Sequence, residues 1–355
     1  MKLVTSARFI RFTALLTIIS LLVWIAACNK SSNESLKVYN PPVHRDAQPV
    51  SLFHIERLDN LFCSDWMSYN KLICSTTRAE SKSEHMYIRD IRTGEEKPIG
   101  IAPYLSVHTS PDGQHLYAYS PNGWEAVLMQ LANNLALPLT IQQGSERGAW
   151  ADDNTYIAPL SGTNDYDIAM INKHNGMVTP IALPQQTDIV RKVQKHQAAI
   201  YVLDQSGQFT MYKSTQAEPI HIRADVADFS LSPDGKQLAF VVNNPLTNQQ
   251  ELYMTAPHAA SRKGKDAIAK TQVINQLSWS PNGKQLAFMT FSLDPGMTGL
   301  YVMEAKTGSS TQVSYQSNVK VPIVWSPDSS RLMVSERNDH GLYNRHSITT
   351  VYQLK

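Results

Sequence analysis

Short apolar runs separated by tight polar turns recur along the chain from about residue 50 to its end. Four copies are explicit, and they read HTSPDGQHLYAYS from His108, SLSPDGKQLAFVV from Ser230, SWSPNGKQLAFMT from Ser278 and VWSPDSSRLMVSE from Val324. In each turn a proline sets φ for the first corner, and Asp or Asn follows it. The pattern predicts a β-hairpin at each of these places.

Degenerate copies lie between the explicit ones. The apolar residue after each turn gives a first series, spaced by 38 to 48 residues: Leu72, Leu116, Ile157, Ile200, Leu238, Leu286 and Leu332. An apolar or aromatic pair on the following strand gives a second series, whose second residues are spaced by 41 to 48: Tyr87, Leu128, Ala169, Thr210, Tyr253, Tyr301 and Tyr343. Two series with one period indicate seven repeated units.

Units of this length, with about four short strands and no amphipathic helix, are typical of β-propeller blades. A blade cannot bury both of its faces alone, and packing around a ring buries them. The last unit runs out before an outer strand, and the segment 50–55 belongs to no complete unit. We therefore predict an all-β fold, a propeller of seven four-stranded blades closed by this N-terminal strand. Six or eight blades are also compatible with the series, because the third and fourth units are degenerate.

The wording SPDGKQLAF resembles the WD40-like, or PD40, repeats of the TolB family of periplasmic propellers, and also the propellers of prolyl-oligopeptidase-type peptidases. The stretch GLYVMEAKTGSSTQVS from Gly299 matches the second half of that repeat. The resemblance covers residues 48–355 and implies the fold rather than a function. TolB proteins carry an α/β domain before the propeller and are not lipidated. Because the N-terminal segment of this chain departs from them in both respects, as described next, we expect a TolB-like lipoprotein rather than TolB itself.

The first 27 residues have the layout of a secretory signal. Lys2, Arg8 and Arg11 precede an apolar stretch at 12–24. The sequence Ile-Ala-Ala-Cys that ends at Cys28 resembles a bacterial lipobox, in which the cysteine is acylated and becomes the new N-terminus. We expect residues 1–27 to be a lipoprotein signal peptide and Cys28 to be lipidated. The alternative is an ordinary signal peptide with an incidental cysteine.

Residues 28–47 are polar and show no periodicity, so they are expected to form a flexible tether with a root-mean-square span of about 25 Å. The folded propeller is then residues 48–355. Asn29, after the lipidated cysteine, matches the sorting pattern for the outer membrane. The expected location is the outer membrane, by a lipid anchor, facing the periplasm.

The net charge excludes one class of partner. The chain has 32 basic and 30 acidic residues, and three of the basic ones, Lys2, Arg8 and Arg11, lie in the signal segment. The mature protein therefore has 29 basic residues against 30 acidic ones, a net charge near −1. Such a weak field gives no reason to expect a nucleic-acid partner.

Cys63 and Cys74 are the remaining cysteines. In the explicit hairpins Trp279 stands opposite Leu286, and the same register in the first unit pairs Asp65 with Leu72 and Cys63 with Cys74. Directly opposed cysteines on antiparallel strands are within reach of a bond, and an oxidising periplasm permits it. The sequence predicts a Cys63–Cys74 disulfide, with two buried thiols as the alternative.

Motifs for catalysis and cofactor binding are missing from the sequence. There is no G-x-S-x-G elbow, no glycine-rich phosphate loop and no H-x-x-x-H spacing among the 11 histidines. We therefore assign no catalytic, metal or cofactor-binding residue, and His108, His115 and His340 are weak candidates. Propellers of the oligogalacturonate-lyase type do build a metal site from scattered histidines, which keeps an enzyme possible.

Other conspicuous residues have structural readings. Trp150, Trp279 and Trp325 stand at equivalent positions before the turn, which predicts packing between blades rather than ligand stacking. The basic run 262–265 is interpreted as a solvated loop, with an anionic-lipid patch as the alternative.

Longer polar loops after the second strands share one face. They lie at 76–85, 161–167, 243–251, 292–299 and 337–341, and we expect the binding site there or at the channel mouth.

These features favour a lipid-anchored envelope protein that acts as a non-catalytic scaffold for an envelope or peptidoglycan-associated partner. The alternative function is a metal-dependent polysaccharide lyase or another propeller enzyme. Several histidines that converge with acidic residues at the channel mouth would favour the enzyme.

Overall fold

The computed structural model describes residues 50–355 except 77–85, 101–105, 120–125, 140, 142–147, 161–165, 187, 258–259, 261–266, 294–296, 316–322 and 340–344. The chain divides into two units, Met1–Lys37 and Val38–Lys355, and the described residues belong to the second. The predicted signal peptide, Cys28 and the tether lie outside the described residues.

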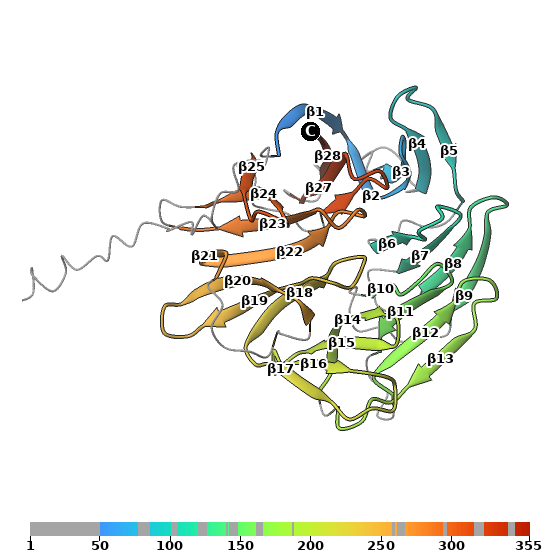
Figure 1. The fold of residues 1–355 in the computed structure, drawn as a ribbon. Coiled ribbons are helices and arrows are strands. Elements are labelled where there is room, and N and C mark those ends of the chain that lie inside the picture. The colour runs from blue at the N-terminus through green and yellow to red at the C-terminus, as the bar shows by residue number, and fades with distance from the viewer. Residues whose placement is uncertain are drawn as a thin grey trace, which may run out of the picture. The chain divides into compact units, whose positions relative to one another are not determined.

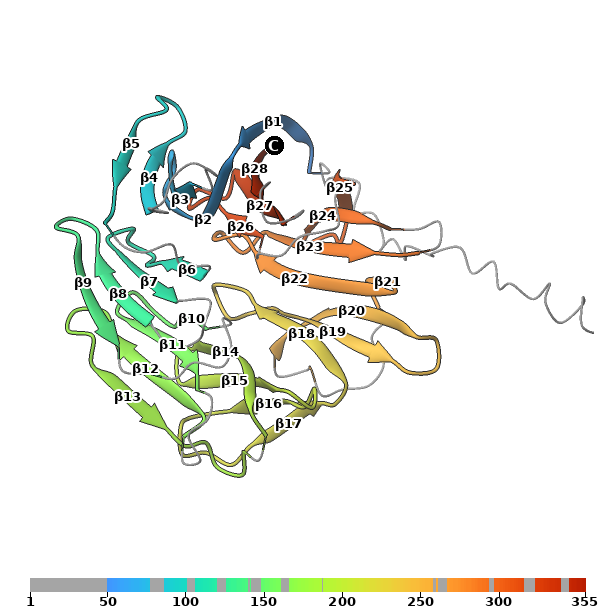
Figure 2. The ribbon, with the colours of Figure 1, turned by 180° about the vertical axis from the view of Figure 1, so that it is seen from behind.

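The described residues form seven four-stranded antiparallel sheets, arranged as blades around a ring (Figures 1 and 2). Blade 1 contains β2 (Leu61–Ser68), β3 (Lys71–Thr76), β4 (Met86–Asp90) and β5 (Glu96–Pro98); blade 2 contains β6 (Ser106–Thr109), β7 (His115–Tyr119), β8 (Ala126–Gln130) and β9 (Leu135–Leu139). Blade 3 contains β10 (Ala149–Trp150), β11 (Thr155–Pro159), β12 (Ile168–Asn172) and β13 (Val178–Ile181); blade 4 contains β14 (Val190–His196), β15 (Ala199–Asp204), β16 (Phe209–Tyr212) and β17 (Ile220–Arg223).

The second half of the ring repeats the pattern. Blade 5 contains β18 (Val226–Leu231), β19 (Leu238–Asn244), β20 (Gln249–Thr255) and β21 (Ala269–Thr271); blade 6 contains β22 (Val273–Trp279), β23 (Gln285–Phe291), β24 (Gly299–Glu304) and β25 (Ser310–Ser314). Blade 7 contains β26 (Val324–Trp325), β27 (Arg331–Asp339), β28 (Arg345–Leu354) and, from the other end of the described chain, β1 (Leu52–Asp59). The described residues include no α-helix. The predicted all-β propeller of seven blades is confirmed.

The ring closes in blade 7, where strands from both ends of the described chain share one sheet. β1 pairs antiparallel with β28, from Leu52 opposite Leu354 to Asp59 opposite Ile348. Asn60, with a positive φ of 61°, then turns the chain directly into β2 of blade 1. The last sheet is therefore completed by the residues that immediately precede the first one.

The tryptophans before the turns join neighbouring blades, as predicted. The indole Nε1 donates to a backbone carbonyl of the preceding blade's inner strand at 3.1 Å for Trp150, 3.0 Å for Trp279 and 3.0 Å for Trp325. Trp66 makes the same bond to Val324 O at 3.4 Å across the closing seam. The sequence comparison missed Trp66 because the first unit lacks the SPDG turn that aligns the other copies.

The register predicted for the first hairpin is half right. Cys63 stands opposite Cys74 and the two are joined by a disulfide. The predicted pairing of Asp65 with Leu72 is wrong, because a β-bulge lies between Cys63 and Asp65 and Trp66 takes the place opposite Leu72. The bulge inserts one residue into the strand and so changes the face to which each later side chain points.

A second register difference occurs in blade 3. Trp150 pairs with Tyr156, so Tyr156 rather than Ile157 is the residue equivalent to the other anchors. The turn there is one residue shorter, because Ala151 N bonds Thr155 O whereas Ser110 N bonds His115 O in blade 2. The missing proline and glycine made this shorter turn hard to recognise from sequence.

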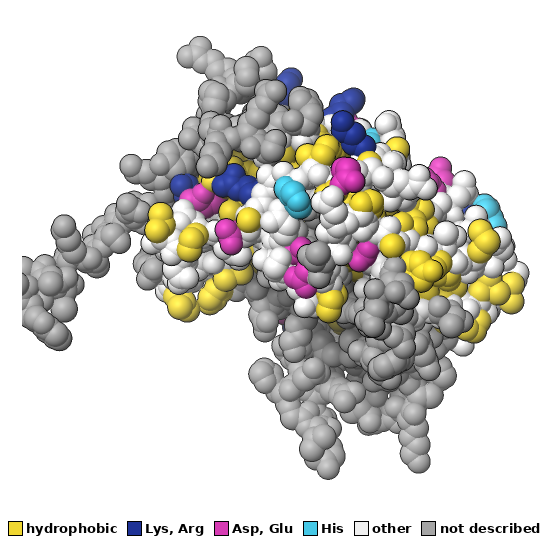
Figure 3. Space-filling model, turned by 90° about the horizontal axis from the view of Figure 1, so that it is seen from below, with side chains coloured by type: hydrophobic (Ala, Val, Ile, Leu, Met, Phe, Trp, Pro, Cys, Tyr) yellow, Lys and Arg dark blue, Asp and Glu magenta, His cyan; other side chains and the backbone are white. Residues whose placement is uncertain are grey.

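On the face seen in Figure 3, charged side chains of both signs are interspersed with apolar ones. Leu135 at the start of β9 is 51% exposed, and Met177 just before β13 is 58% exposed.

The outer strands of blades 1, 2 and 3 each contain a proline: Pro98, Pro138 and Pro180. A proline lacks the N–H that a further strand would need, so these edges are protected against pairing with another chain.

The disulfide provides a first test. Its cysteines are separated by 11 residues in sequence, and closing a loop of this size should stabilise the fold by about 2–3 kcal/mol. A Cys63→Ala/Cys74→Ala variant should lose about this free energy in urea unfolding. Peptide mapping of the exported protein without reductant should recover the linked pair, and finding both thiols free would contradict the assignment.

A close approach of two turns provides a second test. Gly113, at φ +67°, packs so tightly on blade 1 that an added Cβ would lie 2.4 Å from Met67 O, whereas a Cβ at Gly94, at φ +74°, would meet nothing nearer than 4.0 Å. Both alanine variants strain the backbone, but Gly113→Ala must also separate blades 1 and 2. Its melting temperature should fall clearly below that of Gly94→Ala, and equal losses would show that the contact is unimportant.

Candidate functional site

A carboxyl group is buried where the inner strands of blades 1 and 2 meet. Asp65 Oδ2 accepts the backbone N–H of Thr109 at 2.5 Å, and Oδ1 accepts that of Trp66 at 2.7 Å. Burial raises the pKa of Asp65 from 3.8 to about 7, although both hydrogen bonds act to lower it. This carboxyl therefore titrates near neutral pH.

A histidine and a tyrosine extend this polar cluster toward blade 3. Tyr156 Oη and His108 Nδ1 lie 2.7 Å apart, and the Tyr156 ring stacks on Tyr117 with centroids 4.0 Å apart. Burial lowers the pKa of His108 from 6.5 to about 4, so the imidazole is neutral at pH 7. Burial, and then electrostatic interaction with Tyr117 and Asp65, raises the pKa of Tyr156 well above its ordinary value. The cluster thus holds a titratable acid beside a neutral base.

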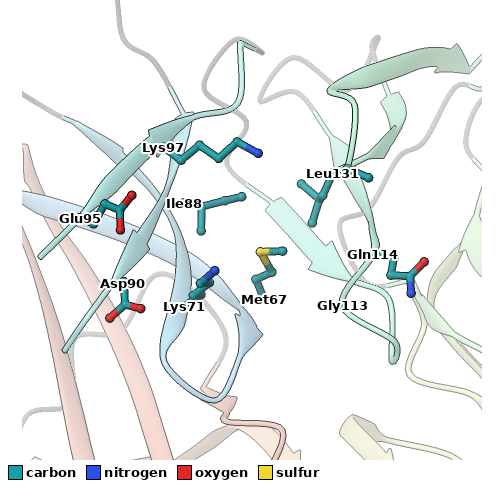
Figure 4. A pocket seen from close by; sticks show the side chains of 10 residues that line it. Met67, Lys71, Ile88, Asp90, Glu95, Lys97, Gly113, Gln114 and Leu131 are labelled. Atoms are coloured by element: carbon teal, nitrogen blue, oxygen red, sulfur yellow. The ribbon is translucent and has the colours of Figure 1, made fainter. Parts of the chain in front are cut away.

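A cavity of about 290 Å³ opens between blades 1 and 2 at the face that carries the tight turns (Figure 4). We call this face the turn face, because the turns from first to second and from third to fourth strand all emerge there. Met67 and Ile88 of blade 1 approach Leu131 of blade 2 and form the apolar wall. Ile88 is 6% and Leu131 3% exposed. The cavity is therefore an opening into the hydrophobic seam between two blades.

Charged side chains of both signs surround this apolar wall. Lys71 and Lys97 supply two cations, and Asp90 and Glu95 supply two anions. In the part of the chain that the structure describes, neither lysine has an ion-pair partner. The Asp90 carboxylate accepts the N–H groups of Arg92 and Thr93 at 2.9 and 3.0 Å, and these bonds lower its pKa. The rim can therefore bind positively charged and negatively charged groups of a ligand.

The structure separates the residues singled out from the sequence. His108 lies in the buried cluster, whereas His115 packs beside His174, with ring centroids 6.3 Å apart, near the 2.6 Å ion pair between the buried Lys173 and the more exposed Asp112. Burial and the charge of Lys173 lower the pKa of His115. His340, the basic run 262–265 and much of the predicted loop face lie outside the described residues.

The cavity was not predicted, and its signal in the sequence is weak. Its lining comes from the four strands of blade 1 and from two turns of blade 2, which no spacing rule brings together. Among the described residues, no group of three or more His, Cys, Asp or Glu side chains could hold a metal ion. A membrane-crossing helix is likewise not found within the described ranges.

Comparison with known proteins identifies the fold. No protein-family model matches the chain, and the search of curated proteins gave no match. Among solved structures it is similar to an oligogalacturonate lyase in complex with manganese, at 12% identity, with a TM-score of 0.62, over 87% of this chain and 98% of the other. It is also similar to the Cps50 (Swd1) β-propeller domain of Myceliophteria thermophila, at 14% identity, with a TM-score of 0.56, over 85% and 99% of the two chains.

TolB from Acinetobacter baumannii is a more distant neighbour, with 11% identity and a TM-score of 0.46, over 84% of this chain and 65% of that one. At 12% and 14% identity the first two likenesses establish the fold alone, and the TolB likeness adds no evidence to this. The chain is a seven-bladed β-propeller, and the TolB-like, WD40-like reading of its repeats fits that fold.

The buried carboxyl of Asp65 gives a pH-dependent prediction. Its pKa in the folded protein, about 7, exceeds the ordinary 3.8, so the folded state binds the proton more tightly than the unfolded state. Ionisation of Asp65 therefore lowers the free energy of unfolding as the pH rises from about 4 to 7. His108 acts in the opposite sense. Its pKa of about 4 in the folded protein lies below the ordinary 6.5, so it lowers the free energy of unfolding as the pH falls from about 6.5 to 4.

Comparison with Asp65→Asn isolates the first effect. Between pH 6 and 8 the unfolding free energy of the native chain should fall by about 1 kcal/mol relative to that of the variant. Urea unfolding of both proteins across this range measures the difference. Parallel pH profiles would mean that Asp65 is ionised throughout.

Proposed function

We propose that this protein is a non-catalytic binding propeller whose cavity between blades 1 and 2 receives an apolar side chain of a protein partner. The observation that carries the proposal is the cavity's composition, an apolar wall of Met67, Ile88 and Leu131 below a rim of two lysines and two acidic residues. Buried anchor side chains that fill such pockets supply most of the affinity at protein interfaces. Rim charges then select the partner and its orientation.

The size of the cavity favours a side chain over a larger ligand. At about 290 Å³ it lies at the lower limit of the volumes that hold drug-sized molecules. The wall is rigid because Ile88 and Leu131 belong to the core cluster between the two blades. A rigid apolar pocket on a ring that presents it to solvent is suited to recognition, since little conformational entropy is lost on binding.

The N-terminal sequence supplies the cellular context of the proposal. Acylation at Cys28, followed by the polar segment 28–47, would tether the propeller to the outer membrane on the periplasmic side. A protein tethered there meets envelope proteins and peptidoglycan-associated proteins. We therefore propose that the partner belongs to one of these groups.

A metal-dependent polysaccharide lyase is the second candidate function. It is favoured by one observation, the similarity of fold to an oligogalacturonate lyase in complex with manganese. The shared fold makes this activity conceivable, but the same fold carries many functions. The lyase hypothesis requires a stoichiometric metal, so the two candidates differ in a measurable property.

A crosslinking pull-down from native envelope, with metal analysis of the same sample, tests the proposal. Ala132 lines the cavity, and Ala132→Trp should occupy it. Lys306 is the matched control, because it holds the same place in the turn of blade 6: Leu131 N bonds Gln114 O and Ala305 N bonds Lys284 O. The partner should crosslink to the native chain and to Lys306→Trp, and at least tenfold less to Ala132→Trp.

Two outcomes would contradict the proposal. Equal crosslinking of both tryptophan variants would place the partner elsewhere on the molecule. A stoichiometric metal without any specific partner would favour the lyase.

A further inference from the structure

A second cavity, of about 270 Å³, lies on the turn face at the seam where the ring closes. It is built from both sides of that seam, by β1, β28 and the start of β27 in blade 7 and by two turns of blade 1. The residues that line it include His54, Glu56, Tyr69, Asn70, Arg92 and Arg331. The partner cavity proposed above has none of these residues in its lining.

The Arg331 side chain lines this cavity and is hydrogen-bonded only to uncharged groups. Its Nη2 donates to Tyr69 Oη at 2.9 Å, and its Nη1 donates to Tyr69 O at 3.3 Å and to Asn70 Oδ1 at 3.4 Å. The guanidinium carbon lies 4.4 Å from the centroid of the Tyr69 ring. Among the described residues no carboxylate pairs with it. The side chain is therefore oriented, and its charge is not neutralised.

Arg92 supplies a second guanidinium to the same cavity. It is exposed, and within the described ranges its side chain has neither a hydrogen bond nor an ion pair. The nearby Asp90 carboxylate accepts the backbone N–H groups of Arg92 and Thr93, and the Arg92 charge also lowers its pKa without a close ion pair. Among the residues that line the cavity, these two cations face one acid, Glu56, so the lining itself has an excess of one positive charge.

The repeat does not require an arginine here. The residue whose N–H bonds the turn serine is His115 in blade 2, Gln237 in blade 5, Gln285 in blade 6 and Arg331 in blade 7. All four positions close the same turn equally well through the backbone. The turn therefore does not need the guanidinium of Arg331. The hydrogen bonds to Tyr69 and Asn70 orient this group, but they leave its positive charge without a counter-charge.

We propose that this cavity, here named the seam cavity, binds a ligand through a single carboxylate held between Arg92 and Arg331. A guanidinium presents paired N–H donors that match the two oxygens of a carboxylate, and one negative charge balances the local excess. Asn70 and Gln353 add amide groups for the polar remainder of the ligand. The carboxylate comes from a peptide C-terminus or from an acidic sugar, which share this chemistry.

Occupation of the seam cavity should strengthen ring closure. The ligand contacts blade 7 through Arg331 and blade 1 through Arg92, so it joins the two blades that meet at the seam. A ligand that binds only the closed ring stabilises the folded state in proportion to the logarithm of its concentration. Thermal stability therefore reports binding without any knowledge of the biological ligand.

The test uses two matched pairs of probes with the full-length protein. N-acetyl-trialanine is compared with its C-terminal amide, and D-glucuronate with its methyl ester, each up to 20 mM, by ligand-observed NMR and thermal melting. We expect a carboxylate form to bind and to raise the melting temperature, and its neutral counterpart to do neither. Which pair responds identifies the source of the carboxylate.

Variants locate the site. Arg92→Gln changes an exposed side chain and should weaken binding about tenfold or more, as should Arg331→Gln. Arg57→Gln is the control, because Arg57 lies on β1 but pairs with Asp59 and is absent from the cavity lining. No binding of either carboxylate, equal binding of the neutral probes, or undiminished binding to Arg92→Gln would overturn the proposal.

Discussion

Closure of the ring is the constraint on which the rest of the structure depends. A four-stranded sheet of this size exposes two apolar faces, and each face is buried only when a neighbouring blade covers it. The cores accordingly lie between blades, as in the cluster that combines Ile73 and Ile88 of blade 1 with Leu116 and Val127 of blade 2. If the last blade did not meet the first, two such faces would be left in water.

The closing seam is reinforced by polar contacts as well as by strand pairing. Ser335 Oγ and Thr349 Oγ1 lie 2.9 Å apart, and Thr349 accepts the N–H of Cys63 at 3.0 Å and donates to Leu61 O at 2.9 Å. These hydroxyls join blade 7 to the strand that carries the disulfide. Hydrogen bonds in a buried seam are strong and directional, so they define the relative position of the two blades as well as stabilising it.

Both described cavities lie beside blade 1 on the turn face. One opens at its seam with blade 2 and the other at its seam with blade 7. The sequence drew attention to the longer loops of the opposite face, because loop length and polarity are visible in a sequence. A cavity between blades has no such signature. Its lining residues, such as Met67 and Leu131, belong to different units, and their neighbours are set by how one sheet packs on the next.

The repeat period and turn chemistry determined the all-β class and the interblade role of the tryptophans and favoured seven blades, because these follow from local patterns that recur. Only the tertiary structure revealed the bulge between Cys63 and Asp65, the burial that raises the pKa of Asp65 to about 7, and the two cavities. The burial of Asp65 and the two cavities depend on contacts between residues about 40 to almost 300 positions apart, such as Thr109 with Asp65 and Arg331 with Tyr69. Periodicity identifies the repeated unit, but the packing of one unit on another decides which side chains meet.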